Sequence, residues 1–336
     1  MTSLSKSRRN PWLDCLKAFA IYLVIAGHAI SNCMVNGSTS MINGIIYFIH
    51  IPLFLVISGS LVKDKNMDAK FWLRLAKRFV VPYTVWTVIL TMFYQGAGHL
   101  LHDGFVGNAE VYFSNWCHSF LWFIKAYLVV YVLWQVLHGL PCWWRLAAGS
   151  ALLVAANFLA QGSKPLAEIA SLALYSYTLF GAGVCVRKYM KKMNVYGIVM
   201  LTVVFLLCLP FAVPENNYFS CSFAHMLQYG DWYVFFIRLV AGTSLSVALI
   251  AVGHIGGFAV PPPYGILPGI GQQTLQIYML QSLFVEAALN RFIRVSDDLY
   301  GFMACFGIAI VKTVFCHVIV NFTVKYKVCR NLLWGL

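Results

Sequence analysis

The chain has 336 residues, a mean hydropathy of +0.75 and a formal net charge of +13. Apolar residues make up 60% of it and charged residues only 10%, whereas soluble domains hold about 25% charged residues. The composition therefore excludes an ordinary soluble domain and predicts a polytopic membrane protein.

Ten apolar stretches approach the ~20 residues that cross a hydrocarbon core. They cover approximately residues 12–31, 41–62, 79–96, 119–140, 144–160, 166–186, 195–213, 233–254, 266–289 and 301–322. They predict helices, because a backbone in lipid must bond to itself and the stretches are too long for barrel strands. We expect an all-α bundle of about ten transmembrane helices, forming a single membrane-embedded domain over residues 1–336.

Loop charges indicate the orientation of these helices, because Lys and Arg concentrate in cytoplasmic loops. The basic residues fall in alternate loops, at 6–9, 63–78, 145, 187–192 and 325–330. The intervening loops carry mainly Asp and Glu. We therefore expect both termini in the cytoplasm. The positive charge then reflects topology and attraction to anionic lipid headgroups, with no nucleic-acid partner.

The basic stretch Lys63 to Arg78 has two interpretations. It is either a positive-inside anchor or a contact surface for an anionic cytosolic ligand. Within it, the string FWLRLAKRF at 71–79 predicts a short amphipathic surface helix that leads into the third span.

Ten cysteines are present without a C-x-x-C pair or a Cys/His metal spacing, so we expect no metal. Most of them lie in apolar runs and are predicted to be small core residues, namely Cys15, Cys185, Cys208, Cys305 and Cys316. Three others fall at or in outward loops, at 33, 117 and 221, which leaves one disulfide there open.

The first apolar stretch contains Lys17 and, eleven positions later, His28. On a helix this spacing puts both side chains on one face, about 16 Å apart along the axis. A charged side chain inside a membrane helix costs about 2.5 kcal/mol or more and usually faces a protein interior or a wet cavity. The pair suits a long ligand with an anion at one end and a reactive group at the other. Asp14, three residues before Lys17, is predicted to form an ion pair with it.

Five strings in order resemble the integral-membrane O-acyltransferases of the acyltransferase-three family. They are RNPWLDCLKAFAIYLVIAGHA at 9–29, FIHIPLFLVISGSLV at 48–62, KRFVVPY at 77–83, LWFIKAYL at 121–128 and IGQQTLQIYMLQ at 270–281. The wording of the first string is most similar to the fucose O-acetylase-like branch, which modifies bacterial surface polysaccharides. The chain departs from the family at Lys17, where Arg is commoner, and at Gln281, where many members have His.

The resemblance implies transfer of acetyl from cytosolic acetyl-coenzyme A to a hydroxyl of a surface polysaccharide or lipid-linked glycan. It implies that Lys17 meets a donor phosphate and that His28 acts as general base, or as a covalent acetyl carrier. The pantetheine arm spans ~15–20 Å, which is comparable to the rise from Lys17 to His28. We expect a multi-pass protein of a bacterial cytoplasmic membrane, and a homodimer stays open.

Further candidates follow from the same strings. His50 approaches the pantetheine arm, orients His28 or is a buried structural histidine. Ser58, followed by Gly59, serves close helix packing or admits the coenzyme. Three cations are candidate phosphate contacts, with Arg78 preferred over Arg74 and Lys77.

Candidates for the acceptor site lie toward the outer ends of their spans. Lys125 and Arg238 either snorkel to the interface or serve an acceptor pocket or an oxyanion. Glu286 is a countercharge for one of them. Trp122 is either an interfacial aromatic or a sugar-stacking side chain, and Gln281 takes the place of the family histidine.

Two other function classes remain open on sequence grounds. One is a proton-coupled transporter or flippase of a glycan or lipid precursor, which would use the intramembrane Lys and His as a proton path. The other is an inactive family member that serves as a scaffold.

Overall fold

The computed structural model of the protein describes residues 10–99, 121–160, 164–190, 192–212, 232–256, 265–284 and 293–336. Apart from one isolated bridge between Met34 and Val295, its regular elements in these ranges are helical, which confirms the all-α prediction there. The helices are α1 (Pro11–Cys33), η1 (Gly37–Thr39), α2 (Met41–Leu61), α3 (Ala69–Leu75), η2 (Ala76–Val80), α4 (Val81–His99), α6 (Trp122–Val136), α7 (Cys142–Leu159), α8 (Lys164–Met190), α9 (Val195–Cys208), η4 (Leu209–Phe211), α11 (Trp232–Ile255), α12 (Ile266–Gln272), α13 (Thr274–Phe284), α14 (Leu299–Thr323) and α15 (Lys327–Leu332).

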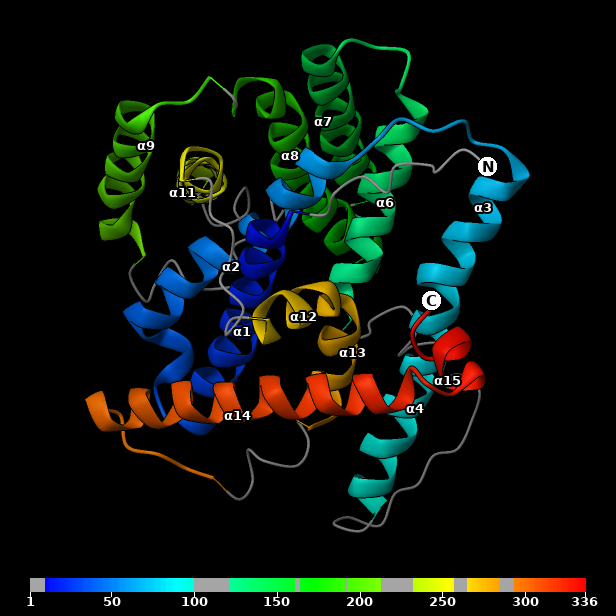
Figure 1. The fold of residues 1–336 in the computed structure, drawn as a ribbon, viewed down its shortest axis with the longest axis vertical. Coiled ribbons are helices and arrows are strands. Elements are labelled where there is room, and N and C mark those ends of the chain that lie inside the picture. The colour runs from blue at the N-terminus through cyan, green and yellow to red at the C-terminus, as the bar shows by residue number, and fades with distance from the viewer. Residues whose placement is uncertain are drawn as a thin grey trace.

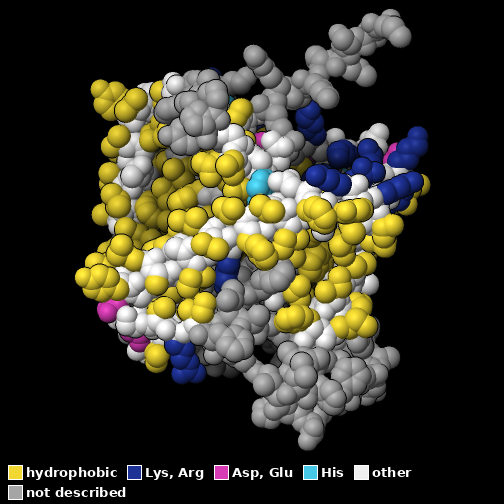
Figure 2. All heavy atoms as spheres, turned by 60° about the horizontal axis from the view of Figure 1, so that its bottom comes forward, with side chains coloured by type: hydrophobic (Ala, Val, Ile, Leu, Met, Phe, Trp, Pro, Cys, Tyr) yellow, Lys and Arg dark blue, Asp and Glu magenta, His cyan; other side chains and the backbone are white. Residues whose placement is uncertain are grey.

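Six helices in the described ranges are long and apolar enough to cross a membrane: α1, α2, α7, α8, α11 and α14. Each coincides with a predicted span, and two shorter apolar helices lie at Trp122–Val136 and Val195–Phe211. The total of about ten spans and the side on which the termini lie stay predictions. In Figure 2, hydrophobic side chains cover most of the visible described face, while Lys and Arg gather mainly along one edge.

The span predicted at 266–289 is not one continuous helix, because it divides at Gln273 into α12 and α13. Three side chains close a hydrogen-bonded ring at this break. His317 Nδ1 donates to Gln273 Oε1 at 2.9 Å, Asn321 Nδ2 donates to His317 Nε2 at 3.0 Å, and Gln273 Nε2 donates to Asn321 Oδ1 at 2.6 Å. The ring ties the break to α14.

Helices α1 and α2 occupy the middle of the molecule (Figure 1). The N-terminus of α1 is fixed by Asn10, whose side chain accepts from the Trp12 N–H, and by Pro11, which suits the first helical position. On one side α1 packs against α12 and α14, and α2 packs on the other side against α8 and α11. The functional candidates on α1 and α2 therefore lie inside the bundle.

Two glycines let the backbones of α2 and α8 touch. A Cβ at Gly59 would lie 1.9 Å from the carbonyl oxygen of Phe180, and one at Gly183 would lie 2.2 Å from that of Val56. This contact confirms that the small residue Gly59 serves close helix packing.

Helices α3, η2 and α4 form one kinked rod along the edge of the molecule (Figure 1). Asp68 caps α3 by accepting from the Phe71 N–H at 2.7 Å, and Trp72 and Leu73 are exposed, as expected for the predicted amphipathic surface helix. The rod then passes through the π-helical turn η2. Because Pro82 has no N–H to donate to the Arg78 carbonyl, α-helical bonding is interrupted at this point.

Candidate active site

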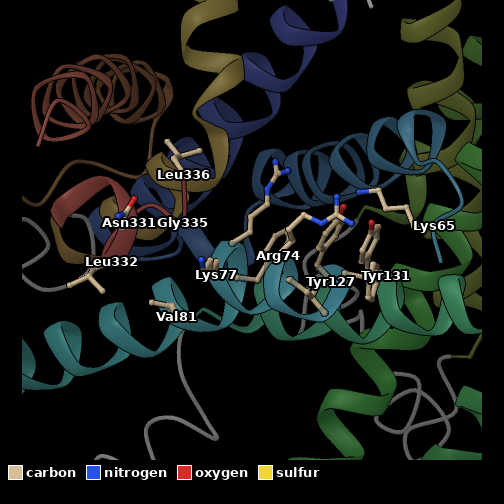
Figure 3. A pocket seen from close by; sticks show the side chains of 14 residues that line it. Lys65, Arg74, Lys77, Val81, Tyr127, Tyr131, Asn331, Leu332, Gly335 and Leu336 are labelled. Carbon is tan, nitrogen blue, oxygen red and sulfur yellow. The ribbon is translucent and has the colours of Figure 1, made fainter. Parts of the chain in front are cut away.

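A basic pocket opens beside η2, with a volume of about 750 Å³. Ligand sites commonly measure ~300–1,000 Å³. Four cations line this basic pocket: Lys65, Arg74, Lys77 and Arg78. Figure 3 shows Arg74 and Lys77 between two ends of the basic pocket, with Tyr127 and Tyr131 of α6 at one end and the segment Asn331–Leu336 at the other. The three cations predicted as phosphate contacts therefore lie in one site.

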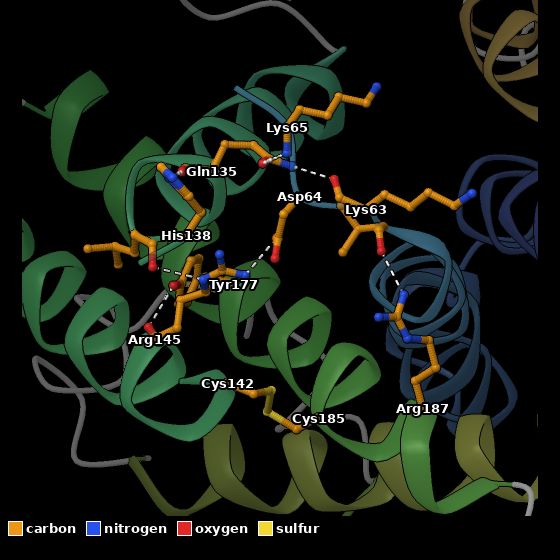
Figure 4. Close-up of polar contacts among 12 residues, drawn as sticks. Lys63, Asp64, Lys65, Gln135, His138, Cys142, Arg145, Tyr177, Cys185 and Arg187 are labelled. Carbon is orange, nitrogen blue, oxygen red and sulfur yellow. Dashed lines mark hydrogen bonds and ion pairs between the residues drawn. A yellow bond between two sulfur atoms is a disulfide. The ribbon is translucent and has the colours of Figure 1, made fainter. Parts of the chain in front are cut away.

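Lys65 was not singled out as a phosphate contact, although it belongs to the basic stretch Lys63 to Arg78, which was interpreted either as an anchor or as a surface for an anionic ligand. It reaches the basic pocket because the loop after α2 is strapped down from α6 by Gln135, a fully buried amide (Figure 4). Gln135 Nε2 donates to the Lys63 carbonyl at 3.1 Å, and Gln135 Oε1 accepts from the Lys65 N–H at 3.0 Å. A lone Gln inside an apolar run was the sequence signal for this strap.

Two arginines, one on α7 and one on α8, also hold the loop that follows α2. Arg145 pairs with Asp64 at 2.9 Å, and Arg187 donates to the Val62 carbonyl at 2.7 Å (Figure 4). The basic loops predicted on one side of the membrane thus meet at one end of the molecule. Each cation has a structural contact, so neither serves only as a topology signal.

Cys185 is a core residue as predicted, with 1% of its surface exposed, but it also forms a disulfide with Cys142 that the sequence did not predict. The first turn of α7 lies against the last turns of α8 here, and the two Cα atoms are 5.8 Å apart, as disulfides require. Among the other cysteines predicted to be core residues, the structure shows free thiols at 15, 208, 305 and 316.

An aromatic ladder runs from the basic pocket along α6, formed by Phe123, Tyr127 and Tyr131 at four-residue steps. Neighbouring ring centroids are 6.2 Å apart in both pairs. Helix α2 faces this ladder. Phe54 lies 6.2 Å from Phe123, and the side chains of Ser58 and Tyr127 share a hydrogen bond. The ladder therefore joins the basic pocket to α2.

Three predicted candidates gather around His50, which lies farther along α2. His50 is 4% exposed and interacts electrostatically with His28 of α1 and with Arg238 of α11. Its Nδ1 lies 2.6 Å from the Ile46 carbonyl oxygen. A carbonyl can only accept, so Nδ1 carries the proton and Nε2 of the neutral ring is left as an acceptor. The structure thus brings two imidazoles and a guanidinium together, and we call them the histidine cluster.

Arg238 does not snorkel to the interface, because it is 1% exposed and its guanidinium lies 5.1 Å from the centroid of the Phe48 ring. That interpretation of the sequence is wrong for this residue. A guanidinium that is enclosed by protein and interacts with the imidazole of His50 is a fixed positive charge in a low-dielectric site.

Lys17 forms the predicted ion pair with Asp14, at 3.2 Å. The uninterrupted helix α1 keeps Lys17 about 16 Å from His28, and Ile21 and Ile25 between them are buried, so this face is turned to protein. Lys17 does not line the basic pocket. The structure therefore separates it from Arg74, Lys77 and Arg78.

Two of the remaining candidates, Trp122 and Lys125, lie on α6 near Phe123, at the end of the ladder away from the basic pocket. Trp122 packs edge-on against Phe123, with centroids 6.0 Å apart, and Lys125 is half-buried one turn further along α6. Gln281 is 1% exposed, and its Nε2 donates to Ser282 Oγ at 3.4 Å. Glu286 lies outside the described residues.

Comparison with known protein families matches residues 10–321 to an acyltransferase domain. Searches of curated proteins and of solved structures found no match. The matched region contains the histidine cluster, the aromatic ladder and the cations of the basic pocket, and it includes the six apolar helices almost entirely. The chain therefore belongs to the acyltransferase-three family of membrane acyltransferases.

Proposed function

We propose that the protein transfers an acetyl group from acetyl-coenzyme A to a hydroxyl of a surface polysaccharide or lipid-linked glycan, in the cytoplasmic membrane of a bacterium. The observation that carries this proposal is an arrangement along α2. The aromatic ladder begins at a pocket lined by four cations and contacts α2 at Phe54 and Ser58, and the histidine cluster lies farther along the same helix.

The basic pocket suits the nucleotide end of the donor, whose phosphates need cations. Arg74 and Arg78 offer planar guanidinium groups, and Lys65 and Lys77 offer point charges. All four side chains are exposed, so a ligand from solution can reach them.

The ladder suits the pantetheine arm. Ser58, beside Tyr127, is eight residues from His50 on α2, which corresponds to about 12 Å along the helix. An arm of ~15–20 Å, laid along Tyr127 and Phe123, spans this rise. The thioester would then arrive at the histidine cluster.

In the histidine cluster, His28 accepts the proton of the acceptor hydroxyl as its oxygen attacks the thioester carbonyl. Arg238 stabilises the negative charge that develops on the carbonyl oxygen. As the carbon–sulfur bond breaks, His28 returns the proton to the departing thiolate. His50, whose Nδ1 is held by the Ile46 carbonyl, is a positioning residue for His28. An acetyl group carried on His28 is the covalent variant of this route.

Two measurements test the proposal. Coenzyme A should raise the melting temperature of the purified full chain, and Arg78→Ala should weaken that effect. His28→Ala should keep coenzyme A binding and abolish acetylation of surface glycans, measured by mass spectrometry of cells with and without the protein. No stabilisation at millimolar coenzyme A would overturn the donor assignment and favour a transporter. Normal acetylation by His28→Ala would remove His28 as the base.

A further inference from the structure

The segment from Lys327 to Leu336 forms the wall of the basic pocket that faces Tyr127 and Tyr131 (Figure 3). Four of its residues line the basic pocket, namely Asn331, Leu332, Gly335 and Leu336. The segment lies beyond residue 321, where the match to the acyltransferase domain stops. This wall is therefore contributed by a part of the chain outside the matched domain.

The segment is held in place by two tryptophans. Trp334 is 1% exposed, and its Nε1 donates to Thr323 Oγ1 at 3.1 Å. Trp86 of α4 donates from its Nε1 to the Leu333 carbonyl at 2.9 Å, and the two indole centroids are 5.4 Å apart. The wall is thus anchored on both α4 and the end of α14.

The main chain of the segment runs directly over the turn that carries two of the cations. Gly335 has a φ of 63°, and a Cβ there would lie 2.6 Å from the Lys77 carbonyl oxygen and 2.7 Å from that of Arg78. Only glycine fits both the backbone angle and the approach. The wall and the cations are therefore parts of one surface.

Asn331 is the one amide side chain among the described residues that line the basic pocket. Its exposed amide offers a donor and an acceptor in one plane, the pair that matches the N7 and N6 atoms of adenine. The rest of the lining supplies cations, aromatic rings and apolar groups. These suit phosphates and the pantetheine arm, and Asn331 supplies the amide pair that matches the edge of a base.

We propose that residues 327–336 close the donor site and that Asn331 recognises the adenine of coenzyme A. This inference rests on the proposed function. It orients the donor, with adenine at the Asn331 end of the basic pocket, phosphates at the cations and the pantetheine arm leaving past Tyr127.

The test compares two ligands on the purified full chain: coenzyme A and 4′-phosphopantetheine, which has the arm and a phosphate but no adenine. Asn331→Ala should weaken coenzyme A binding by about ten-fold, the loss expected for one amide–adenine pair. It should leave 4′-phosphopantetheine binding unchanged. Leu332→Ala, the control, alters the neighbouring lining residue and should leave the preference between the two ligands as in the wild type.

Equal weakening of both ligands by Asn331→Ala, or no weakening of either, would overturn the adenine assignment. In both cases a loss of coenzyme A binding in Arg78→Ala would leave the proposed function standing. Absence of coenzyme A binding by the wild type would overturn the proposed function and this inference together.

Discussion

The ammonium of Lys17 lies 3.2 Å from a carboxylate oxygen of Asp14, one helical turn earlier. Lys17 thus has its charge paired and lies outside the basic pocket, so the donor phosphates are left to the four cations of that pocket. Lys17→Met should leave coenzyme A affinity within about two-fold of the wild type, whereas Arg78→Ala should weaken it. Titrated thermal shifts measure both affinities. A loss of affinity in Lys17→Met as large as that in Arg78→Ala would place Lys17 in the donor site.

Arg238 is predicted to act on turnover and not on donor binding. Arg238→Met removes a charge aimed at the carbonyl oxygen, so acetylation should fall by about 10²–10³-fold, the loss typical of one oxyanion-stabilising donor. Coenzyme A affinity should stay within two-fold of the wild type, because the basic pocket is untouched. Arg238→Lys, which keeps the charge, should recover part of the rate. A binding defect as large as the rate defect would point to a purely structural role.

The contact between α2 and α8 predicts a sharp effect of one added methyl group. Gly59→Ala would place a Cβ 1.9 Å from the Phe180 carbonyl oxygen, and overpacking of this kind costs about 1–3 kcal/mol. The melting temperature in detergent should fall accordingly. Gly307→Ala is the matched control, because a Cβ there meets nothing within 4 Å. Equal melting temperatures for the two variants would contradict the close approach.

The Cys142–Cys185 disulfide joins residues 43 positions apart. Replacing both cysteines with Ala should lower the free energy of unfolding by about 2–4 kcal/mol. A reductant should destabilise the wild type in the same way and leave the double variant unaffected. Cys208→Ala, which removes a free thiol, serves as the control. Alkylation of Cys142 and Cys185 without reductant would show that the bond is absent from the purified protein.

Asp298 gives the fold a defined dependence on pH. The Gly301 N–H, which donates to this N-cap carboxylate at 2.8 Å, holds the pKa of Asp298 below its ordinary value of 3.8. The stability that ionised Asp298 adds to the folded state is therefore complete above pH 3.8, and it is lost as the pH falls through the lower pKa of the folded state. Asp298→Ala should melt below the wild type at pH 7, with the gap closing below about pH 3.8. Asp298→Asn should cap the helix without this pH dependence, and a gap that persists at low pH would contradict the assignment.

Much of the candidate site could be predicted where the signal lies within one helix. The Asp14–Lys17 pair follows from a three-residue spacing, and the packing role of Gly59 follows from its small size. The grouping of Arg74, Lys77 and Arg78 was accessible because they lie within five residues of each other. In each case local geometry alone decides which side chains share a face.

Contacts between distant segments could not be predicted in this way. The disulfide depends on how α7 meets α8, and the position of Lys65 depends on Gln135, seventy residues later. The break at Gln273 depends on His317 and Asn321 of α14. Hydropathy describes each helix separately, so it contains no information about which helices become neighbours.

The π-helical turn at Ala76–Val80 accommodates one residue more than an α-helix would over the same stretch. The turn absorbs this extra residue, so α3 keeps nearly the rotation relative to α4 that an α-helix one residue shorter would give. If the same residues were wound as a continuous α-helix, α3 would be turned by about 100° relative to α4, and Arg74 would be carried to a different side of the rod. The wide turn therefore lets the chain hold one more residue beside the basic pocket while its positive charges stay on one side.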